Sequence, residues 1–313
     1  MIDQTYRLQS CLWPLPPAPG QGLRLALWQG TGDAATPDAV RANLDRLETV
    51  AAIAAGHGAQ LLAFPELYLS GYIVTPELAR ALAEPVDGPS LQQVAATARR
   101  HGMALACPYP ERATVAGQER FYDAIALFGP DGTLLRNYRK THLWGPDEKL
   151  CWTPGYQTAE EGPAFTVQQV NGIGVGLLNC YEAEFPELTR RLALLGAQVV
   201  LIPTAADTWA LLSDGRRTDR PYPDISRTLL PAHAFENRCF VAYANRCGEE
   251  TVNGRPMAGY LGNSVICGPH GDVLVAARPE PSLLLTDCVP GDYGETHPTG
   301  TRHLEDLRTD LFG

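Results

Sequence analysis

The chain has 313 residues, of which 45% are hydrophobic and 19% are charged, a composition typical of a globular protein with one large or two ordinary domains. A formal charge of −10, without any run of Lys and Arg, argues against a nucleic-acid-binding surface. No stretch approaches the roughly 18 consecutive apolar residues of a membrane span, so we expect no membrane insertion.

The N-terminus and the cysteines indicate the compartment. Four prolines between positions 14 and 19 interrupt the place where a secretory signal would have its apolar segment. The eight cysteines are scattered, with no C-x-x-C pair and no His at zinc-ligand spacing. We therefore expect a cytoplasmic protein with reduced thiols and no structural or catalytic metal.

The first part of the chain predicts alternating strands and helices. Residues 1–22 are Pro-rich and aperiodic, and we interpret them as an arm outside the core. The predicted strands are 23–28, 60–64 and 103–109. The predicted helices are 37–57, which starts at a Pro and ends at Gly, and 89–101, which Gly102 stops.

Hairpins dominate the rest of the chain. Two are predicted, 120–128 with 133–138 and 164–170 with 173–178. The further predicted strands are 198–203, 239–245, 260–267, 273–277 and 282–288, and the further helices begin at Phe185 and span 224–238. A polar stretch, 205–224, suggests a long functional loop. Strands that first alternate with helices and then form hairpins suggest a layered α/β domain with mixed sheets.

Cys180 lies where an apolar strand, 173–178, gives way to a helical pattern. At such a turn a side chain is held rigidly and faces the crevice beyond the carboxyl ends of the strands, where ligands usually bind in open α/β sheets. The alternative is an ordinary buried cysteine, because free Cys is among the most buried residue types.

Three chemically matched residues follow three predicted strands directly: Glu66, Lys140 and Cys180. If those strands lie side by side, the side chains converge. A carboxylate can take the proton of the thiol, and an ammonium can stabilise both the thiolate and the oxyanion of a tetrahedral intermediate. Each also has a structural interpretation, since Glu66 could cap a short helix and Lys140 could be a solvated charge at a strand end. The presence of all three residues at strand ends favours a catalytic role over these structural interpretations.

Three segments resemble the signature segments of the nitrilase superfamily, the carbon–nitrogen hydrolases: F-P-E-L-Y-L-S-G-Y (64–72), Y-R-K-T-H-L (138–143) and C-Y-E-A-E-F-P-E (180–187). The resemblance spans roughly residues 23–290, in the family's order. It implies a four-layer αββα sandwich with Glu66 as general base, Lys140 as electrostatic stabiliser and Cys180 as nucleophile.

The resemblance also implies roles for neighbours of the triad. Family amidases often place a second glutamate shortly after the lysine, and Glu148 falls there, to orient Lys140 and the substrate amide. The backbone N–H of Tyr181 would be a second oxyanion donor. Glu182 stands where the family usually has Asp, which suggests a shifted wall beside the nucleophile. A loop-holding role is expected for His142, since the scheme leaves it no proton to carry.

Segments 109–112, 190–197 and 234–245 resemble the branch of aliphatic amidases that act on ω-amino and amino-acid amides, 5-aminopentanamidase among them. Glu182 and Glu184 add negative charge near Cys180 that could favour a substrate with an ammonium group. Either glutamate could instead have a purely structural role, and this interpretation is favoured for Glu184. The loop 207–224 looks longer than usual for this branch, and the arm is extra.

The sequence thus predicts a thiol amidohydrolase that converts a small aliphatic primary amide to acid and ammonia through a thioester, without a cofactor. Alternatives are an N-carbamoyl amine or amino-acid hydrolase, a nitrilase, and a non-catalytic ligand-binding member of the fold. The domain is expected at 23–290, followed by a tail, 291–313. The apolar pattern Leu304, Leu307 and Leu311 in that tail suggests contact with a second copy in a homo-oligomer, or a tail that folds back on its own subunit.

Overall fold

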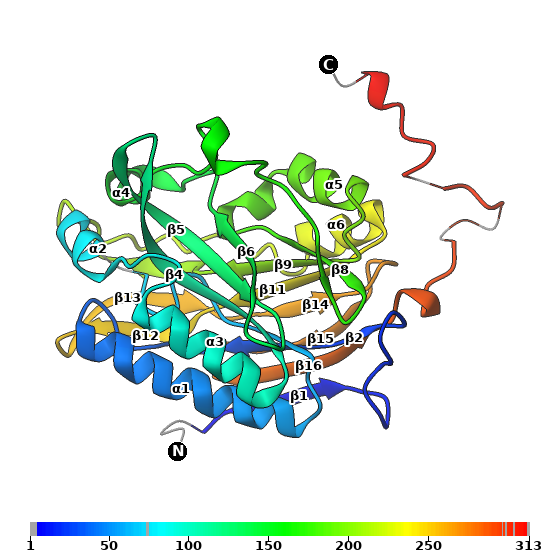
Figure 1. The fold of residues 1–313 in the computed structure, drawn as a ribbon, viewed down its shortest axis with the longest axis horizontal. Coiled ribbons are helices and arrows are strands. Elements are labelled where there is room, and N and C mark those ends of the chain that lie inside the picture. Colours follow the sequence, from blue (N-terminus) through cyan, green and yellow to red (C-terminus); the bar gives the residue numbers. More distant parts are fainter. Residues whose placement is uncertain (1–4, 73–74, 296, 298, 303, 312–313) are drawn as a thin grey trace.

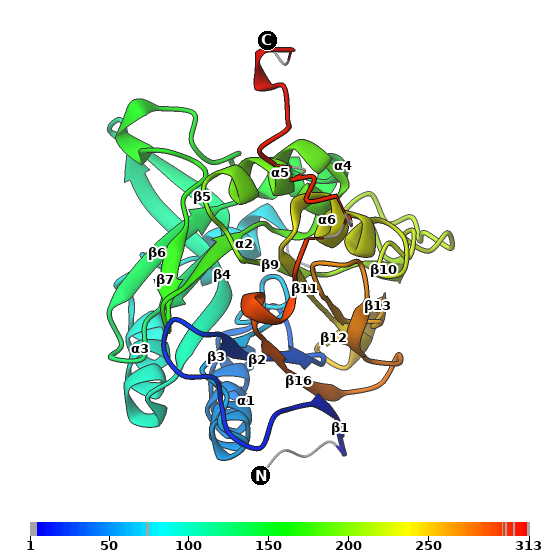
Figure 2. The same cartoon turned by 90° about the vertical axis from the view of Figure 1, so that its right-hand side faces the viewer.

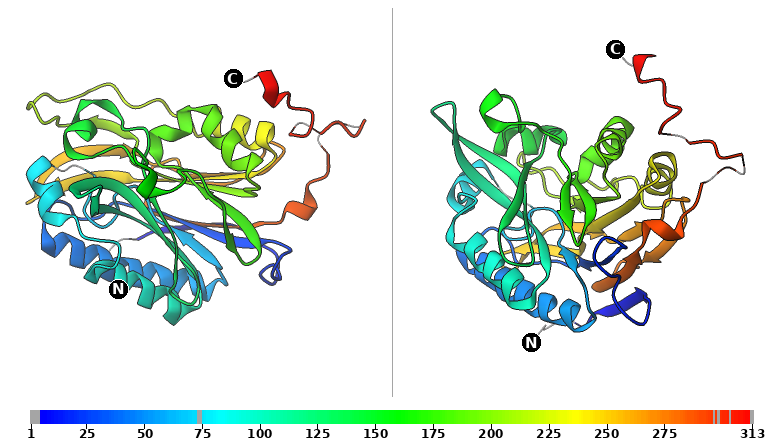
Figure 3. Two further views of the ribbon diagram at one scale, coloured as in Figure 1. Left: turned by 45° about the horizontal axis from the view of Figure 1, so that its top comes forward. Right: turned by 45° about the vertical axis from the view of Figure 1, so that its right-hand side comes forward.

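A computed structural model describes residues 5–72, 75–295, 297, 299–302 and 304–311. Two large sheets stack face to face, and helices cover the outer face of each (Figures 1 and 3). This is the four-layer αββα sandwich that the resemblance implies. No helix among the described residues is long and apolar enough to cross a membrane.

The first sheet has seven strands in the order β1-β16-β2-β3-β4-β5-β6. Their bounds are β1 (Arg7–Cys11), β16 (Ser282–Cys288), β2 (Leu23–Gln29), β3 (Leu61–Ala63), β4 (Ala104–Val115), β5 (Gln118–Phe128) and β6 (Leu134–Arg139). The second sheet has the order β15-β14-β11-β9-β8-β7. Its strands are β15 (Val273–Ala276), β14 (Val265–Cys267), β11 (Phe240–Asn245), β9 (Val199–Thr204), β8 (Ile173–Leu177) and β7 (Gln168–Val170).

Strand β2 shows how the sequence builds the layers. Side chains alternate across a strand, so Leu25 and Leu27 enter the apolar core between the sheets, whereas Ala26 and Trp28 enter the core under the helices. All seven residues of the strand are buried because both faces of the sheet are covered. An uninterrupted apolar run therefore predicts an inner strand of this sandwich.

Helices α1 (Pro37–Gly56) and α3 (Pro89–His101) pack on the first sheet, and α5 (Pro186–Leu194) and α6 (Leu229–Asn237) on the second. Capping residues mark the ends of these helices. The Thr36 hydroxyl accepts a hydrogen bond from the Ala39 N–H at the start of α1. Gly102 ends α3 in the left-handed conformation, at φ 58°.

Four predictions from the sequence need correction. The arm 1–22, of which residues 1–4 lie outside the described part, contributes β1, which pairs in parallel with β16 at the edge of the sheet (Figure 2). The loop 205–224 contains β10 (Asp207–Ala210), and helix α6 is shorter than 224–238. Strand β10 joins β13 (Arg255–Leu261) and β12 (Cys247–Val252) in a third sheet, and the predicted strand 260–267 is divided between the end of β13 and β14.

The C-terminal tail leaves the sandwich after β16 (Figure 2). An ion pair between Arg238 and Glu295, 2.6 Å long, holds its beginning against the end of α6. Further along, Leu311 is 70% exposed. Positions 296, 298, 303, 312 and 313 of the tail lie outside the described residues, and contact with a second copy stays a prediction.

Candidate active site

Cys180 lies at the start of a single 3-10 turn (Cys180–Glu184) directly after β8. Its φ of 51° places it in the left-handed region, which a residue with a Cβ adopts at an energetic cost. Such strain concentrates at functional positions, where the surrounding structure holds it. Only 5% of the residue is exposed, and the backbone of Ala205, after β9, donates a hydrogen bond to the thiol. The turn thus presents a fixed, nearly buried sulfur.

Glu66 follows β3, and its backbone is clamped. The Arg246 guanidinium donates hydrogen bonds of 2.9 and 3.0 Å to the Glu66 carbonyl and one of 2.8 Å to the Leu67 carbonyl. The side chain of Glu66 is fully buried, and its Oε1 accepts a 2.5 Å hydrogen bond from the Lys140 ammonium. No sequence pattern indicated that Arg246, 180 residues away, would hold this loop.

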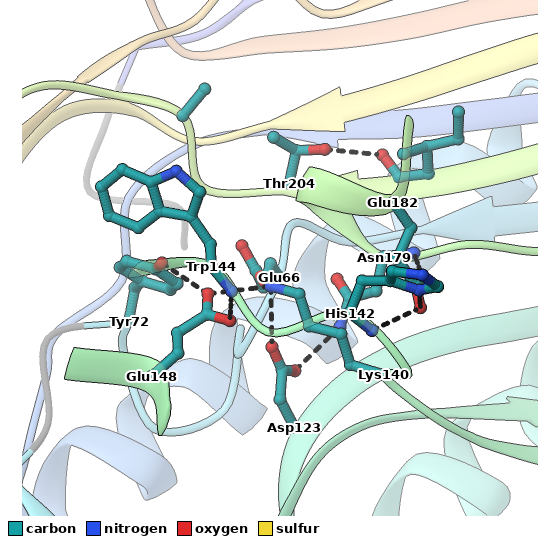
Figure 4. Close-up of polar contacts among 12 residues, drawn as sticks. Glu66, Tyr72, Asp123, Lys140, His142, Trp144, Glu148, Asn179, Glu182 and Thr204 are labelled. Carbon is teal, nitrogen blue, oxygen red and sulfur yellow. Dashed lines mark hydrogen bonds and ion pairs between the residues drawn. The ribbon is translucent and has the colours of Figure 1, made fainter. Parts of the chain in front are cut away.

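Lys140 lies at the end of β6, with its ammonium among three carboxylates (Figure 4). Its Nζ is 2.5 Å from Glu66, 2.8 Å from Glu148 and 3.6 Å from Asp123. Burial alone would lower the pKa of Lys140, but the charges of Glu148 and Glu66 outweigh burial and raise it well above its usual range. Lys140 is therefore a permanent cation inside the protein.

Glu148 occupies the first turn of α4 (Gly145–Cys151). Besides Lys140, its carboxylate accepts hydrogen bonds of 2.7 Å from the Tyr72 hydroxyl and the Trp144 N–H. Burial, opposed by Lys140, raises the pKa of Glu148. The structure thus brings Glu148 into contact with Lys140, in the relation that the resemblance implies.

The thiol of Cys180 is electrostatically coupled to this cluster. Burial and the negative charge of Glu66 raise its pKa well above the usual range, against the opposing effect of Lys140. The resting group is therefore a thiol, and it needs a nearby base before it can attack. The convergence of Glu66, Lys140 and Cys180 that their strand-end positions predict is present. The three strands do not lie side by side, because β4 and β5 separate β3 from β6 and β8 belongs to the second sheet.

Asp123, in the middle of β5, is a member of the cluster that the sequence analysis missed. It is fully buried and accepts a 2.9 Å hydrogen bond from the Asn179 side chain, next to the nucleophile. Burial and the charge of Glu66 raise the pKa of Asp123 well above its usual range. The sequence does contain a signal for Asp123, because Asp is unusual in the apolar part of a strand, here between Tyr122 and Ala124.

The carboxylates of Glu66, Asp123 and Glu148 lie within 4.8 Å of one another, a spacing that could serve a metal ion. In this structure the Lys140 ammonium lies among them and is in hydrogen-bond contact with two. An ammonium there would repel a divalent cation, so the donor set does not fit a metal while Lys140 is in place.

Glu182 does not provide a free charge for a substrate. Its carboxylate is fully buried and accepts hydrogen bonds from the Tyr138 hydroxyl, the Asn179 N–H and the Thr141 N–H, each 2.7 Å long. Burial works to raise its pKa, but hydrogen bonds from His142, Thr141 and Tyr138 outweigh burial and lower it. The acid ties β6 to the turn after β8, which corrects the substrate role suggested by the sequence.

Replacing Glu182 with glutamine is expected to lower the free energy of unfolding by about 2–4 kcal/mol. The NH2 group of glutamine would face a backbone N–H group, and since both are donors, neither could form a hydrogen bond there. Urea denaturation at pH 7 measures this. The matched control is Glu187→Gln on the exposed side of α5, with an expected change below about 0.5 kcal/mol. Equal stability of the two variants would contradict a structural role for Glu182.

Three other residues considered in the sequence analysis have clear positions. Tyr181 is the second residue of the 3-10 turn, where backbone N–H groups lack partners within the helix. His142 stacks on Phe185 with ring centroids 4.5 Å apart and lies beside Thr141, which agrees with a loop-holding role. Glu184 receives a hydrogen bond from the Tyr222 hydroxyl, as expected of a structural acid.

A pocket of about 500 Å³ opens beside this cluster. Tyr72 and Glu148 line this pocket and also belong to the cluster, in which Glu148 contacts both Tyr72 and Lys140 (Figure 4). Aromatic and aliphatic side chains form much of its wall, including Trp144, Trp152 and Met257. A mostly apolar pocket with a few converging polar groups is typical of a small-molecule site.

A four-layer sandwich with a buried thiol, carboxylates and a lysine at its strand ends defines the class of thiol hydrolases that cleave carbon–nitrogen bonds. Comparison with known proteins agrees. The sequence profile of the family described as carbon-nitrogen hydrolase matches residues 24–298. The chain belongs to the carbon-nitrogen hydrolase family, and it is an enzyme that acts on carbon–nitrogen bonds.

Among its relatives, a hydrolase from the pqqF 5' region of Pseudomonas protegens is 38% identical over 93% of this chain and 90% of that protein. An (R)-stereoselective amidase of a Pseudomonas species is 37% identical over 75% of this chain and 74% of its own length. An amidase from Nesterenkonia sp. has a similar structure, with a TM-score of 0.70, 31% identity, and coverage of 94% of this chain and 96% of that one. A variant of the Nesterenkonia enzyme has been solved with butyramide, at a TM-score of 0.69 and 32% identity, with coverage of 94% and 97%.

Proposed function

We propose that this enzyme hydrolyses small aliphatic primary amides, among them amino-acid and ω-amino amides, to the acid and ammonia. The observation that carries the proposal is the buried Lys140 ammonium in contact with Glu66 and Glu148 and electrostatically coupled to the thiol of Cys180. Amidases among the relatives and solved structures support this substrate class.

Each residue of the cluster has a role in the proposed reaction. Glu66 takes the proton of Cys180 as the sulfur adds to the amide carbonyl. Lys140 and the backbone N–H of Tyr181 stabilise the resulting oxyanion. Glu66 passes the proton to the leaving ammonia, and the thioester remains. Glu66 then activates water against the thioester and releases the acid.

Glu148 is a positioning residue in this scheme. It binds the Lys140 ammonium on the side facing the pocket, and its own carboxylate is held by Tyr72 and Trp144. A second acceptor for Lys140 keeps the ammonium pointed at the oxyanion while Glu66 changes its protonation state. The scheme uses no cofactor.

The rival substrates are carbamoyl compounds and nitriles, which also pass through an adduct on the thiol. N-carbamoylputrescine amidases of Solanum lycopersicum and Solanum tuberosum are 28% identical to this chain. The higher identity to an (R)-stereoselective amidase favours amides. A non-catalytic binding role would leave the strained, buried thiol and its base without a purpose.

A panel of purified-enzyme assays tests the proposed function. We expect ammonia release from butyramide, hexanamide and 5-aminopentanamide, with a higher kcat/KM for the amides than for N-carbamoylputrescine or pentanenitrile. Carbon dioxide is scored beside ammonia, since only a carbamoyl substrate yields both. Equal amounts of the two gases from the carbamoyl compound, with all amides inert, would show that the enzyme is a carbamoyl hydrolase.

Cytoplasmic location and homo-oligomeric assembly also belong to this proposal. Cysteines that are all free in the structure support a reducing compartment. The exposed Leu311 in the tail supports contact with a second copy.

A further inference from the structure

Asp207 is an acidic residue of the pocket to which the proposed reaction assigns no role. It begins β10 in the region that the sequence predicted to be a loop, and β13 pairs with it on one side. Its side chain lines the same pocket as Tyr72 and Glu148. Only 6% of the residue is exposed, so the carboxylate is removed from bulk water but open to the pocket.

Within the described part of the chain, no other residue forms an ion pair or side-chain hydrogen bond with the Asp207 carboxylate. Neighbouring acids differ in this respect. Glu148 is held by Lys140, and Asp147, at the pocket wall, accepts hydrogen bonds from the Ser213 N–H and hydroxyl. A nearly buried carboxylate without a partner is unfavourable unless a ligand supplies the charge or the donors.

Asp207 is close to the reacting sulfur along the chain. Ala205, whose backbone contacts the Cys180 thiol, precedes it by two residues. Two extended residues span at most about 7 Å, so the backbone of Asp207 lies within about 7 Å of the backbone that contacts the thiol. The aromatic rings of Tyr72, Trp144 and Trp152 line the same pocket and offer faces that attract a cation.

We propose that Asp207 is the binding site for a positively charged group of the substrate, so that the preferred substrate is an aliphatic amide carrying an ammonium group a few bonds from the amide. This inference rests on the proposed amidase function and adds the residue that selects among amides. It replaces Glu182 and Glu184, the acids that the sequence suggested for this role, since their carboxylates bind Tyr138 and Tyr222.

Because Asp207 titrates, the proposed selection for a cationic substrate should depend on pH. Burial raises its pKa to about 6. The carboxylate is therefore charged above pH 6 and neutral below it, so selection for a cation is present above this pH and is lost as the pH falls. The other ionisable groups around Asp207 come from three further segments of the chain, and they are Tyr72, Asp147, Glu148, Cys151, Arg255 and Tyr260.

The experiment compares 5-aminopentanamide with hexanamide, in which a methyl group replaces the ammonium. For the wild type at pH 8 we expect a higher kcat/KM for the charged amide. In Asp207→Asn the ratio of the two kcat/KM values should fall about 10- to 100-fold, the effect of losing a hydrogen bond between charged groups. The wild-type ratio should fall similarly between pH 8 and pH 5.

The matched control is Asp147→Asn, which removes the same charge from the same pocket but from an acid already bound to Ser213. Its ratio should change by less than about fivefold. Thermal melting checks that both variants fold. An unchanged ratio in Asp207→Asn, with hexanamide hydrolysed normally by the wild type, would overturn this inference and leave the amidase function standing. A wild type that hydrolyses no amide would overturn both.

Discussion

Replacing Cys180 with alanine is expected to lower the kcat for amides by about 10,000-fold or more, because no other group in the cluster can form the covalent intermediate. The remaining oxyanion donors cannot substitute for a nucleophile. The fold should be retained, since alanine removes one atom and accepts the same backbone conformation. A melting temperature within about 4 °C of the wild type would show this.

A suitable control is Cys239→Ala. Cys239 is also fully buried, but it precedes β11, whose carboxyl end points toward the active site. The length of that strand, about 20 Å, separates it from the chemistry. We expect near wild-type turnover from this variant. A Cys180→Ala enzyme that keeps a tenth of the wild-type activity would show that the thiol is not the nucleophile.

Replacing Glu66 with glutamine is expected to lower kcat by about 100- to 10,000-fold, the range for loss of a general base. The amide oxygen of glutamine can still accept the hydrogen bond from Lys140, so the geometry of the cluster should persist. The pKa of Cys180 should move down, because a negative charge that destabilises the thiolate is removed. Turnover should therefore fall although the thiol becomes more acidic. If the acidity of the thiol alone set the rate, turnover would rise instead.

Two measurements check this prediction, steady-state turnover and the pH dependence of Cys180 alkylation by iodoacetamide. Glu187→Gln, at an exposed position on α5, controls for the change in net charge and should alter neither. Loss of turnover with a downward shift of the alkylation profile supports Glu66 as the base. A variant with a tenth of the wild-type activity would exclude Glu66 from proton transfer.

The cluster around Lys140 explains why the thiol needs a base. Three carboxylates surround one ammonium, and the negative charge of Glu66 disfavours the thiolate. Burial and the charge of Glu66 raise the pKa of Asp123, so this acid takes up a proton more readily than an exposed Asp, which reduces the repulsion within the cluster. A protonated Asp123 would still accept the hydrogen bond from Asn179. The electrostatic balance of the site thus depends on residues from β5 and β6 as well as on the turn after β8.

Much of the site could be predicted from the sequence because it is built from local signals. Apolar runs that end in a polar residue identified the turns carrying Glu66, Lys140 and Cys180. Strands β3 and β6 run in the same direction, so the turns after them lie at one edge of the sheet. The helices could be predicted for the same reason. The capping Thr36 and the left-handed Gly102 act on their own neighbours, so their effect is visible without the fold.

Only the tertiary structure decided what each remaining acid does. Asp123, Glu182 and Asp207 look alike in the sequence. Asp123 is buried beside Lys140, Glu182 ties β6 to the turn after β8, and Asp207 faces the pocket. Their partners lie in distant segments, and Arg246 reaches the Glu66 backbone across 180 residues. The charge and reactivity of a carboxylate depend on its burial and on the donors it meets, and chain folding, not sequence spacing, brings those donors together.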